Sequence, residues 1–266
     1  MPYRTYRAPI SPPQRRNVLL GGALLAGSAG FVNAVLLSFF RVPVSHMSGA
    51  VAHVGVGLGG RSLGEAAGAL TIIGAFFFGS TVSGAIVGRD TALPGRRYGV
   101  LLVIESVALG AAGSCLYARL STGVPLAAFA CGLQNAMSSS YYGLALRTTH
   151  VTGMVTDLGV IVGQWLRHRR IPRWKALLLT VLASAFLVGG VVGAASVRWL
   201  DYRVLYVPAV GTLAAGVAYF LRASRRVRRQ RAATAAGHVA YSPRGRRSGS
   251  EPAVTGRGGK APDMES

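Results

Sequence analysis

Acidic residues are scarce in this chain. Its 266 residues include 8 Asp and Glu against 29 Lys and Arg, and charged residues make up only 14% of the total. That fraction lies well below the ~25% that is usual for soluble domains. Hydrophobic residues make up 51%, and the charges fall into short clusters between long apolar runs. The composition excludes an ordinary soluble fold and predicts an all-α, polytopic bundle of transmembrane helices.

Cysteine is rare as well. Cys115 and Cys131 both fall inside apolar segments, so the sequence predicts neither a disulfide framework nor a metal site, and no cofactor is expected. The net charge of +21 is compatible with nucleic-acid binding, but the Arg clusters flank apolar runs, as the positive-inside rule describes. No basic fold with interleaved aromatic residues is evident. The expected partner is therefore the lipid bilayer, and nucleic acid is not.

Composition divides the chain into three regions. Residues 1–16 are polar, basic and rich in proline, which predicts a cytoplasmic tail, and residues 17–222 hold the apolar runs. The first run, Val18 to Phe40, is long enough to span the ~30 Å hydrocarbon core, which favours a retained helix over a cleaved signal peptide. Residues 223–266 are predicted to be a disordered basic tail. Its first part, Arg222 to Arg231, is expected either to contact anionic lipid or to serve only as a stop-transfer flank.

One motif occurs twice. Each copy has a hydroxyl residue, His, a spacer, a second hydroxyl residue and Gly, and is preceded by Gly-x-x-Asn-Ala. The motif residues are Asn33, Ser45, His46, Ser48 and Gly49 in the first copy and Asn135, Thr149, His150, Thr152 and Gly153 in the second. The two His are 104 residues apart (150 minus 46), and the two Asn are 102 apart (135 minus 33). This predicts an internal duplication, with repeats of about 17–120 and 123–222.

The span count depends on the two short His-motif segments, His46 to about Gly59 and Thr148 to Trp165. Six longer runs are predicted spans: Val18–Phe40, Leu63–Val87, Tyr98–Leu116, Pro125 to about Leu146, Ala176–Val197 and Val204–Leu221. If both His segments are re-entrant, the chain has six spans and inverted repeats. If both cross, it has eight spans and parallel repeats, and seven result if only the second crosses. The positive-inside rule favours six, with both termini cytoplasmic.

Polar side chains at membrane depth are costly, so they are candidates for function. The hypothetical solute-binding residues are Asn33, His46, Ser48, Gly49, Gln134, Asn135, Thr149, His150, Thr152 and Gly153. Ser48 and Thr152 are expected to cap helix starts, where backbone N–H groups and the helix dipole attract an anion. Asn33 and Asn135 are expected to form hydrogen bonds across the pseudo-symmetry axis. The alternative is that these residues serve only capping and helix packing.

Three ionisable residues are candidates for ion or proton coupling. His53 and Asp157 each follow the motif His by seven residues, which is two helical turns and predicts one shared helix face. Glu105 is a single acid within an apolar run. A counterpart of Glu105 in the second repeat is not apparent.

The two motifs resemble a known family. Gly30-Phe31-Val32-Asn33-Ala34 with Ser45-His46-Met47-Ser48-Gly49, and Gly132-Leu133-Gln134-Asn135-Ala136 with Thr149-His150-Val151-Thr152-Gly153, look like the YoaK-type family of bacterial integral membrane proteins. The resemblance covers about residues 17–222 and implies the bacterial plasma membrane. The family usually carries Asp where Asn33 stands, and Thr-Gly-Asn where Ser48-Gly49-Ala50 stand. Its function is uncharacterised, so the resemblance supplies no substrate.

The sequence favours a small transporter or permease for a small polar or anionic solute. A membrane enzyme is not expected, because no nucleophile elbow, His-Glu-x-x-His motif or carboxylate pair is present. A scaffold or sensor that uses the basic tail is the remaining alternative. The solute, the coupling ion and the oligomeric state are not determined by the sequence.

Overall fold

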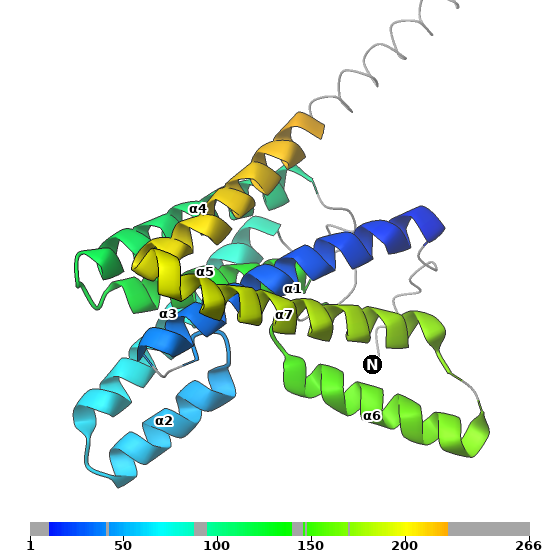
Figure 1. Ribbon diagram of the computed structural model, residues 1–266, viewed down its shortest axis with the longest axis horizontal. Helices are drawn as coiled ribbons and strands as arrows, with labels where there is room; N and C mark the ends of the chain where they lie inside the picture. Colours follow the sequence, from blue (N-terminus) through cyan, green and yellow to red (C-terminus); the bar gives the residue numbers. More distant parts are fainter. Residues whose placement is uncertain are drawn as a thin grey trace, which may run out of the picture. The chain divides into compact units, whose positions relative to one another are not determined.

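The computed structural model describes residues 11–40, 43–87, 95–139, 146, 148–169 and 171–222, and all regular secondary structure there is helical (Figure 1). The helices are α1 (Pro12–Phe40), α2 (Met47–Gly59), α3 (Leu63–Val87), α4 (Arg96–Tyr117), α5 (Gly123–Ser138), α6 (Val151–His168) and α7 (Arg173–Leu200). A 3₁₀ turn, Asp201–Leu205, and a helical segment, 206–222, follow. These residues belong to one compact unit, Met1–Ser224, and the predicted tail lies outside the described residues.

Three predicted boundaries differ from the structure. The first helix begins at Pro12, because proline is tolerated in the first turn of a helix, where its missing N–H would have no partner; residues 12–16 are therefore helical. The span expected to reach Leu146 ends as a helix at Ser138. The second His segment becomes helical at Val151, and the helix ends at His168. The next residue, Arg169, adopts a left-handed conformation with φ 53°.

Four helices are long and apolar enough to cross a bilayer: α1, α3, α4 and the continuous stretch Arg173–Arg222. Fifty residues of helix would measure ~75 Å, more than twice the ~30 Å core. The chain turns at Asp201, with φ 50° and ψ −140°, so α7 and residues 206–222 form two arms (Figure 1). The chain is thus a multi-pass membrane protein. α2, α5 and α6 are not among the helices that qualify, and α5 was expected to span, so the span count stays a prediction.

The duplication is visible in how the helices pack. α1 lies along α7, and α3 lies along α5, so the first helix of each repeat pairs with the third helix of the other. At Gly30 a Cβ atom would overlap the backbone carbonyl of Phe186, and at Gly132 it would overlap that of Phe76. The two glycines are 102 residues apart and the two phenylalanines are 110 residues apart, so the sequence offset between the repeats differs slightly from helix to helix.

A second pair of contacts repeats the same offsets. A Cβ at Gly79 would overlap the carbonyl of Phe129, and one at Gly189 would overlap that of Gly27. Each crossing thus brings two backbones into direct contact through glycine, as small residues allow in membrane helices. Four contacts at two consistent offsets show that the internal repeat in the sequence is a repeat in three dimensions.

The two short helices diverge from the middle of the bundle, α2 toward the lower left and α6 toward the lower right of the view (Figure 1). α2 forms a hairpin with α3, and α6 forms the equivalent hairpin with α7. The His46 ring contacts Phe186, in the central part of α7. Paired short helices, one in each repeat, recur in transporters built from inverted repeats, and the re-entrant placement of α2 and α6 stays a prediction.

Candidate functional site

The two motif histidines stand immediately before the two short helices. His46 is the N-cap residue of α2 and His150 that of α6, and neither position has a side-chain cap. The prediction that Ser48 and Thr152 cap these helices is wrong. Each lies at the second helical position, and capping requires the residue before the helix, whose backbone is not yet helical.

The starts of both short helices remain open. Among the described residues, the backbone N–H groups of Met47 and Ser48 in α2, and of Thr152 and Gly153 in α6, have no hydrogen-bond partner. Such groups carry the positive end of the helix dipole. Each helix start can therefore accept an anionic or carbonyl oxygen.

A buried hydrogen-bond chain fixes the orientation of His46. The Ser45 hydroxyl donates to Asn33 Oδ1 at 2.9 Å, and the Ser45 backbone N–H reaches the same oxygen at 3.4 Å. Ser45 Oγ also lies 3.0 Å from His46 Nδ1. Because the hydroxyl hydrogen is already donated to Asn33, the proton between Ser45 and His46 must belong to Nδ1. Neutral His46 consequently presents Nε2 as a hydrogen-bond acceptor.

The second repeat builds a matching arrangement. The Thr149 hydroxyl donates to Asn135 Oδ1 at 3.1 Å, as Ser45 does to Asn33. Both asparagines therefore bind within their own repeat, and among the described residues neither forms the expected hydrogen bond across the symmetry axis. Cross-repeat bonds come instead from Gln134, whose Nε2 donates to the Leu25 carbonyl at 3.0 Å, and from Ser80, whose hydroxyl donates to the Gly132 carbonyl at 3.1 Å.

The two histidines lie within electrostatic range of each other. The His46 ring lies edge-on to Phe186 with centroids 5.6 Å apart. A Cβ on Gly153 would overlap the His150 imidazole, and one on Gly49 would lie 2.9 Å from the Pro43 ring. The motif glycines therefore make room for the groups that surround the two helix starts.

A cavity of about 510 Å³ lies between α6 and α7. His150 and Gly153 line it together with Asp157, Lys175 and Trp174, and leucines supply much of its apolar wall. His150 and Asp157 thus share one cavity. The Asp157 carboxylate pairs with Lys175 Nζ at 2.9 Å, with both side chains about half exposed. The cavity joins a motif histidine to an ion pair farther along the hairpin.

The other two coupling candidates occupy contrasting surroundings. His53 is exposed on α2. Glu105 is only 1% exposed within α4, and its Oε2 has no hydrogen-bond partner among the described residues. No group of three or more His, Cys, Asp and Glu residues in the described part of the chain is arranged to hold a metal ion.

Two residues that sequence reasoning did not select belong to this region. Thr148 is fully buried beside Thr149, and its Oγ1 has no partner among the described residues. Lys175 lies in the first turn of α7 and pairs with Asp157. The pair Thr148-Thr149 before His150 is a sequence signal for Thr148. Nothing in the sequence distinguishes Lys175 from the neighbouring arginines.

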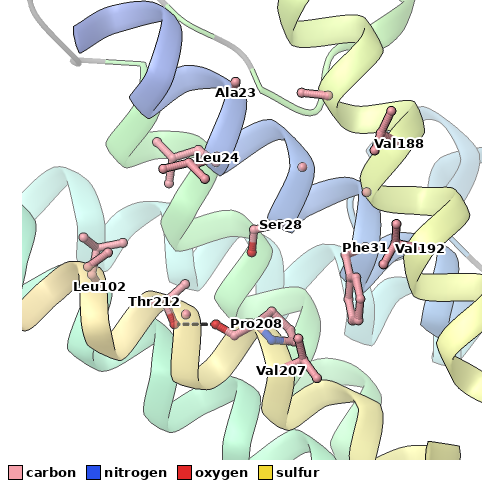
Figure 2. Close-up of a pocket in the computed structure, with 16 residues that line it drawn as sticks. Ala23, Leu24, Ser28, Phe31, Leu102, Val188, Val192, Val207, Pro208 and Thr212 are labelled. Atoms are coloured by element: carbon pink, nitrogen blue, oxygen red, sulfur yellow. Dashed lines mark hydrogen bonds between the residues drawn. The ribbon is translucent and has the colours of Figure 1, made fainter. Parts of the chain in front are cut away.

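A second hollow, of about 470 Å³, has a different character (Figure 2). α1, α7 and residues 206–222 line it, with Leu102 from α4, and its wall is almost entirely apolar. The Thr212 hydroxyl faces it but donates to the Pro208 carbonyl at 3.0 Å. No residue of the repeated motif lines this groove, so the polar chemistry is concentrated at the starts of α2 and α6.

Comparison with known proteins gives one match. A family model described as "Protein of unknown function (DUF1275)" matches residues 21–218, a range that contains every described helix except the ends of α1 and of the last segment. No curated protein and no solved structure matches the chain.

Proposed function

The chain belongs to the DUF1275 family of proteins of unknown function, so its activity has to be argued from the site. We propose that it is a small transporter that binds a polar or anionic solute between the starts of α2 and α6. The paired helix starts carry this proposal. Each offers N–H groups without a partner in the described structure and a histidine at the N-cap, and the two histidines lie within electrostatic range of each other. Half-helices that meet near the midplane are a recurrent way for membrane transporters to bind solutes.

The polar groups behind the histidines support binding rather than packing alone. A serine or threonine and an asparagine hold each motif in place, so the N–H groups and His46 Nε2 are held ready before a solute arrives. Preorganised donors and acceptors lose less entropy on binding than mobile ones. The solute-binding set comprises His46 and His150 with the helix-start N–H groups of Met47, Ser48, Thr152 and Gly153. Asn33, Gln134, Asn135 and Thr149 position it.

The cavity between α6 and α7 is the proposed access route. It contains His150 at one end and the Asp157–Lys175 pair farther along, so a solute that enters from the loop side meets a charged pair before the central site. Inverted repeats allow the α2–α3 hairpin to open in the same way from the opposite side. No chemical conversion of the solute is proposed.

We also propose a family subgroup and an orientation in the membrane for this protein. We place the protein among the YoaK-type members of bacterial plasma membranes, with both termini in the cytoplasm, because the basic segments fit that orientation. Arg222 to Arg231 would contact anionic lipid there.

Transport by reconstituted full-length protein tests the proposal. Proteoliposomes are screened with labelled inorganic anions, carboxylates and amino acids, and a transported solute is then tested with His46→Ala and His150→Ala. We expect each variant to lose uptake by about tenfold or more, the equivalent of one hydrogen bond to the solute at ~1.4 kcal/mol.

The matched control is His168→Ala, because this exposed histidine ends α6 and is absent from the cavity lining. Unchanged uptake by the double variant His46→Ala/His150→Ala would refute the proposed site. A scaffold that acts through its basic tail predicts the reverse pattern, in which deletion of residues 223–266 abolishes the cellular phenotype and the histidine variants retain it.

A further inference from the structure

Glu105 is a buried acid for which the described structure offers no cation. It lies in α4, is 1% exposed, and Oε2 lacks a hydrogen-bond partner among the described residues. The one ion pair formed by these residues joins Asp157 to Lys175. An unpaired carboxylate is strongly disfavoured at membrane depth, so the arrangement suits the neutral, protonated acid.

The helices around α4 bring one titratable group to Glu105. Cys131 of α5 is buried and interacts with it electrostatically. The charged residues on α3, on the 3₁₀ turn and on residues 206–222 are Glu65, Asp201, Arg203 and Arg222, and each is exposed. Tyr202 and Tyr206 lie near the end of α4, and Tyr219 lies beside Tyr98 at its start.

A short path connects this acid to the central site. Cys131 and Asn135 are one turn apart on the same side of α5, where residues four positions apart are neighbours. Asn135 accepts the hydrogen bond from Thr149, and Thr149 precedes His150. Glu105 therefore lies beside the same helix, α5, that carries Asn135 of the second motif.

We propose that Glu105 is the proton-binding group that couples solute movement to a proton gradient. The carboxylate accepts a proton from hydronium on one side of the membrane, leaving water, and returns it to water on the other side. Asp157 is less suited to this role because Lys175 neutralises it, and His53 is exposed. The coupling role rests on the proposed transport function, but proton binding at Glu105 can be tested without a solute.

The direct test is labelling with dicyclohexylcarbodiimide, which reacts with protonated carboxyl groups in apolar surroundings. Full-length protein in liposomes is treated, digested and analysed by mass spectrometry. We expect Glu105 to be labelled at mildly acidic pH and labelling to fall as the pH is raised. Glu105→Gln should abolish the label. Glu65→Gln, which alters an exposed acid on α3, should leave it unchanged. A folded protein in which Glu105 is unlabelled throughout this range would overturn the proposal.

Transport assays distinguish the proposed role of Glu105 in proton coupling from the proposed solute transport on which it rests. Glu105→Gln should retain solute exchange but lose accumulation driven by a pH gradient, whereas Glu65→Gln should retain both. If Glu105→Gln unfolds, Glu105→Asp serves instead, and it should keep the label and the driven uptake. Normal driven uptake by Glu105→Gln would refute coupling while leaving the solute site intact. Normal transport by the His46 and His150 variants would refute the solute site, whatever the labelling shows.

Discussion

Replacement of Gly132 by alanine tests the packing that creates the fold. A Cβ at this position on α5 would overlap the carbonyl oxygen of Phe76 on α3 and would lie 2.8 Å from its carbonyl carbon. These are backbone atoms, so no side-chain rotation relieves the overlap. Since ordinary Cβ contacts begin near 3.4 Å, relief of the contact with the carbonyl carbon alone needs about 0.6 Å, the difference between 3.4 and 2.8 Å. The carbonyl oxygen lies closer still, so the helices must separate by more than this, and such overpacking costs about 1–3 kcal/mol.

The repeat provides a second variant whose loss of stability should match that of Gly132→Ala. A Cβ at Gly30 would meet the carbonyl carbon of Phe186, also at 2.8 Å, so Gly30→Ala should cost nearly the same as Gly132→Ala. Gly74→Ala is the control, because a Cβ at this site on α3 has nothing within 4 Å. It should be neutral or stabilising by up to about 1 kcal/mol, the helix-propensity difference between glycine and alanine.

The free energy of unfolding would be measured by titration with SDS in mixed micelles, followed by circular dichroism. Gly30→Ala and Gly132→Ala should each unfold at a lower SDS fraction than the wild type, and Gly74→Ala should not. If Gly132→Ala proved as stable as Gly74→Ala, the direct contact between α3 and α5 backbones would be refuted. If Gly30→Ala and Gly132→Ala differed widely, the equivalence of the two crossings would be refuted.

Three further predictions follow from other contacts. Asn135→Ala should destabilise the protein by about 0.6–2 kcal/mol, since the Thr149 hydroxyl loses its acceptor, and the same titration measures it. In a double-mutant cycle, Asp157→Asn and Lys175→Met should show a coupling of at most about 1 kcal/mol, because both side chains are about half exposed; a larger value would mean that the pair is less hydrated than the structure indicates. Single cysteines at Gly60 and Arg169, the ends of α2 and α6, should react with impermeant maleimide from opposite sides of the membrane, and reaction from one side would contradict inverted repeats.

Much of the architecture can be predicted from composition and spacing. The all-α membrane fold follows from the apolar runs, because only helices satisfy their own backbone hydrogen bonds in lipid when no β-barrel pattern is present. The duplication follows from two motifs at nearly one offset. The short length of the segment after His46 and the charge distribution indicate re-entrant helices.

The details of the site depend on where helices begin, which local sequence specifies poorly. Ser48 and Thr152 have the chemistry of caps, but the helices begin one residue earlier, so the histidines occupy the N-cap positions. Asn33 and Asn135 bind the hydroxyl residue of their own motif. The path of the chain after α1 and α5 decides which nearby donor each asparagine amide oxygen meets. Hydrophobic periodicity does not predict that path.

The sequence by itself determined that the chain is a duplicated membrane protein and which polar residues the two repeats share. Only the tertiary structure decided that α1 crosses α7 and α3 crosses α5 through glycine, that Lys175 meets Asp157, and that Glu105 has no described cation beside it. The physical reason is that each of these contacts joins helices from distant parts of the chain. Hydropathy and spacing describe one helix at a time, whereas a buried charge gains or loses its partner through the packing of several.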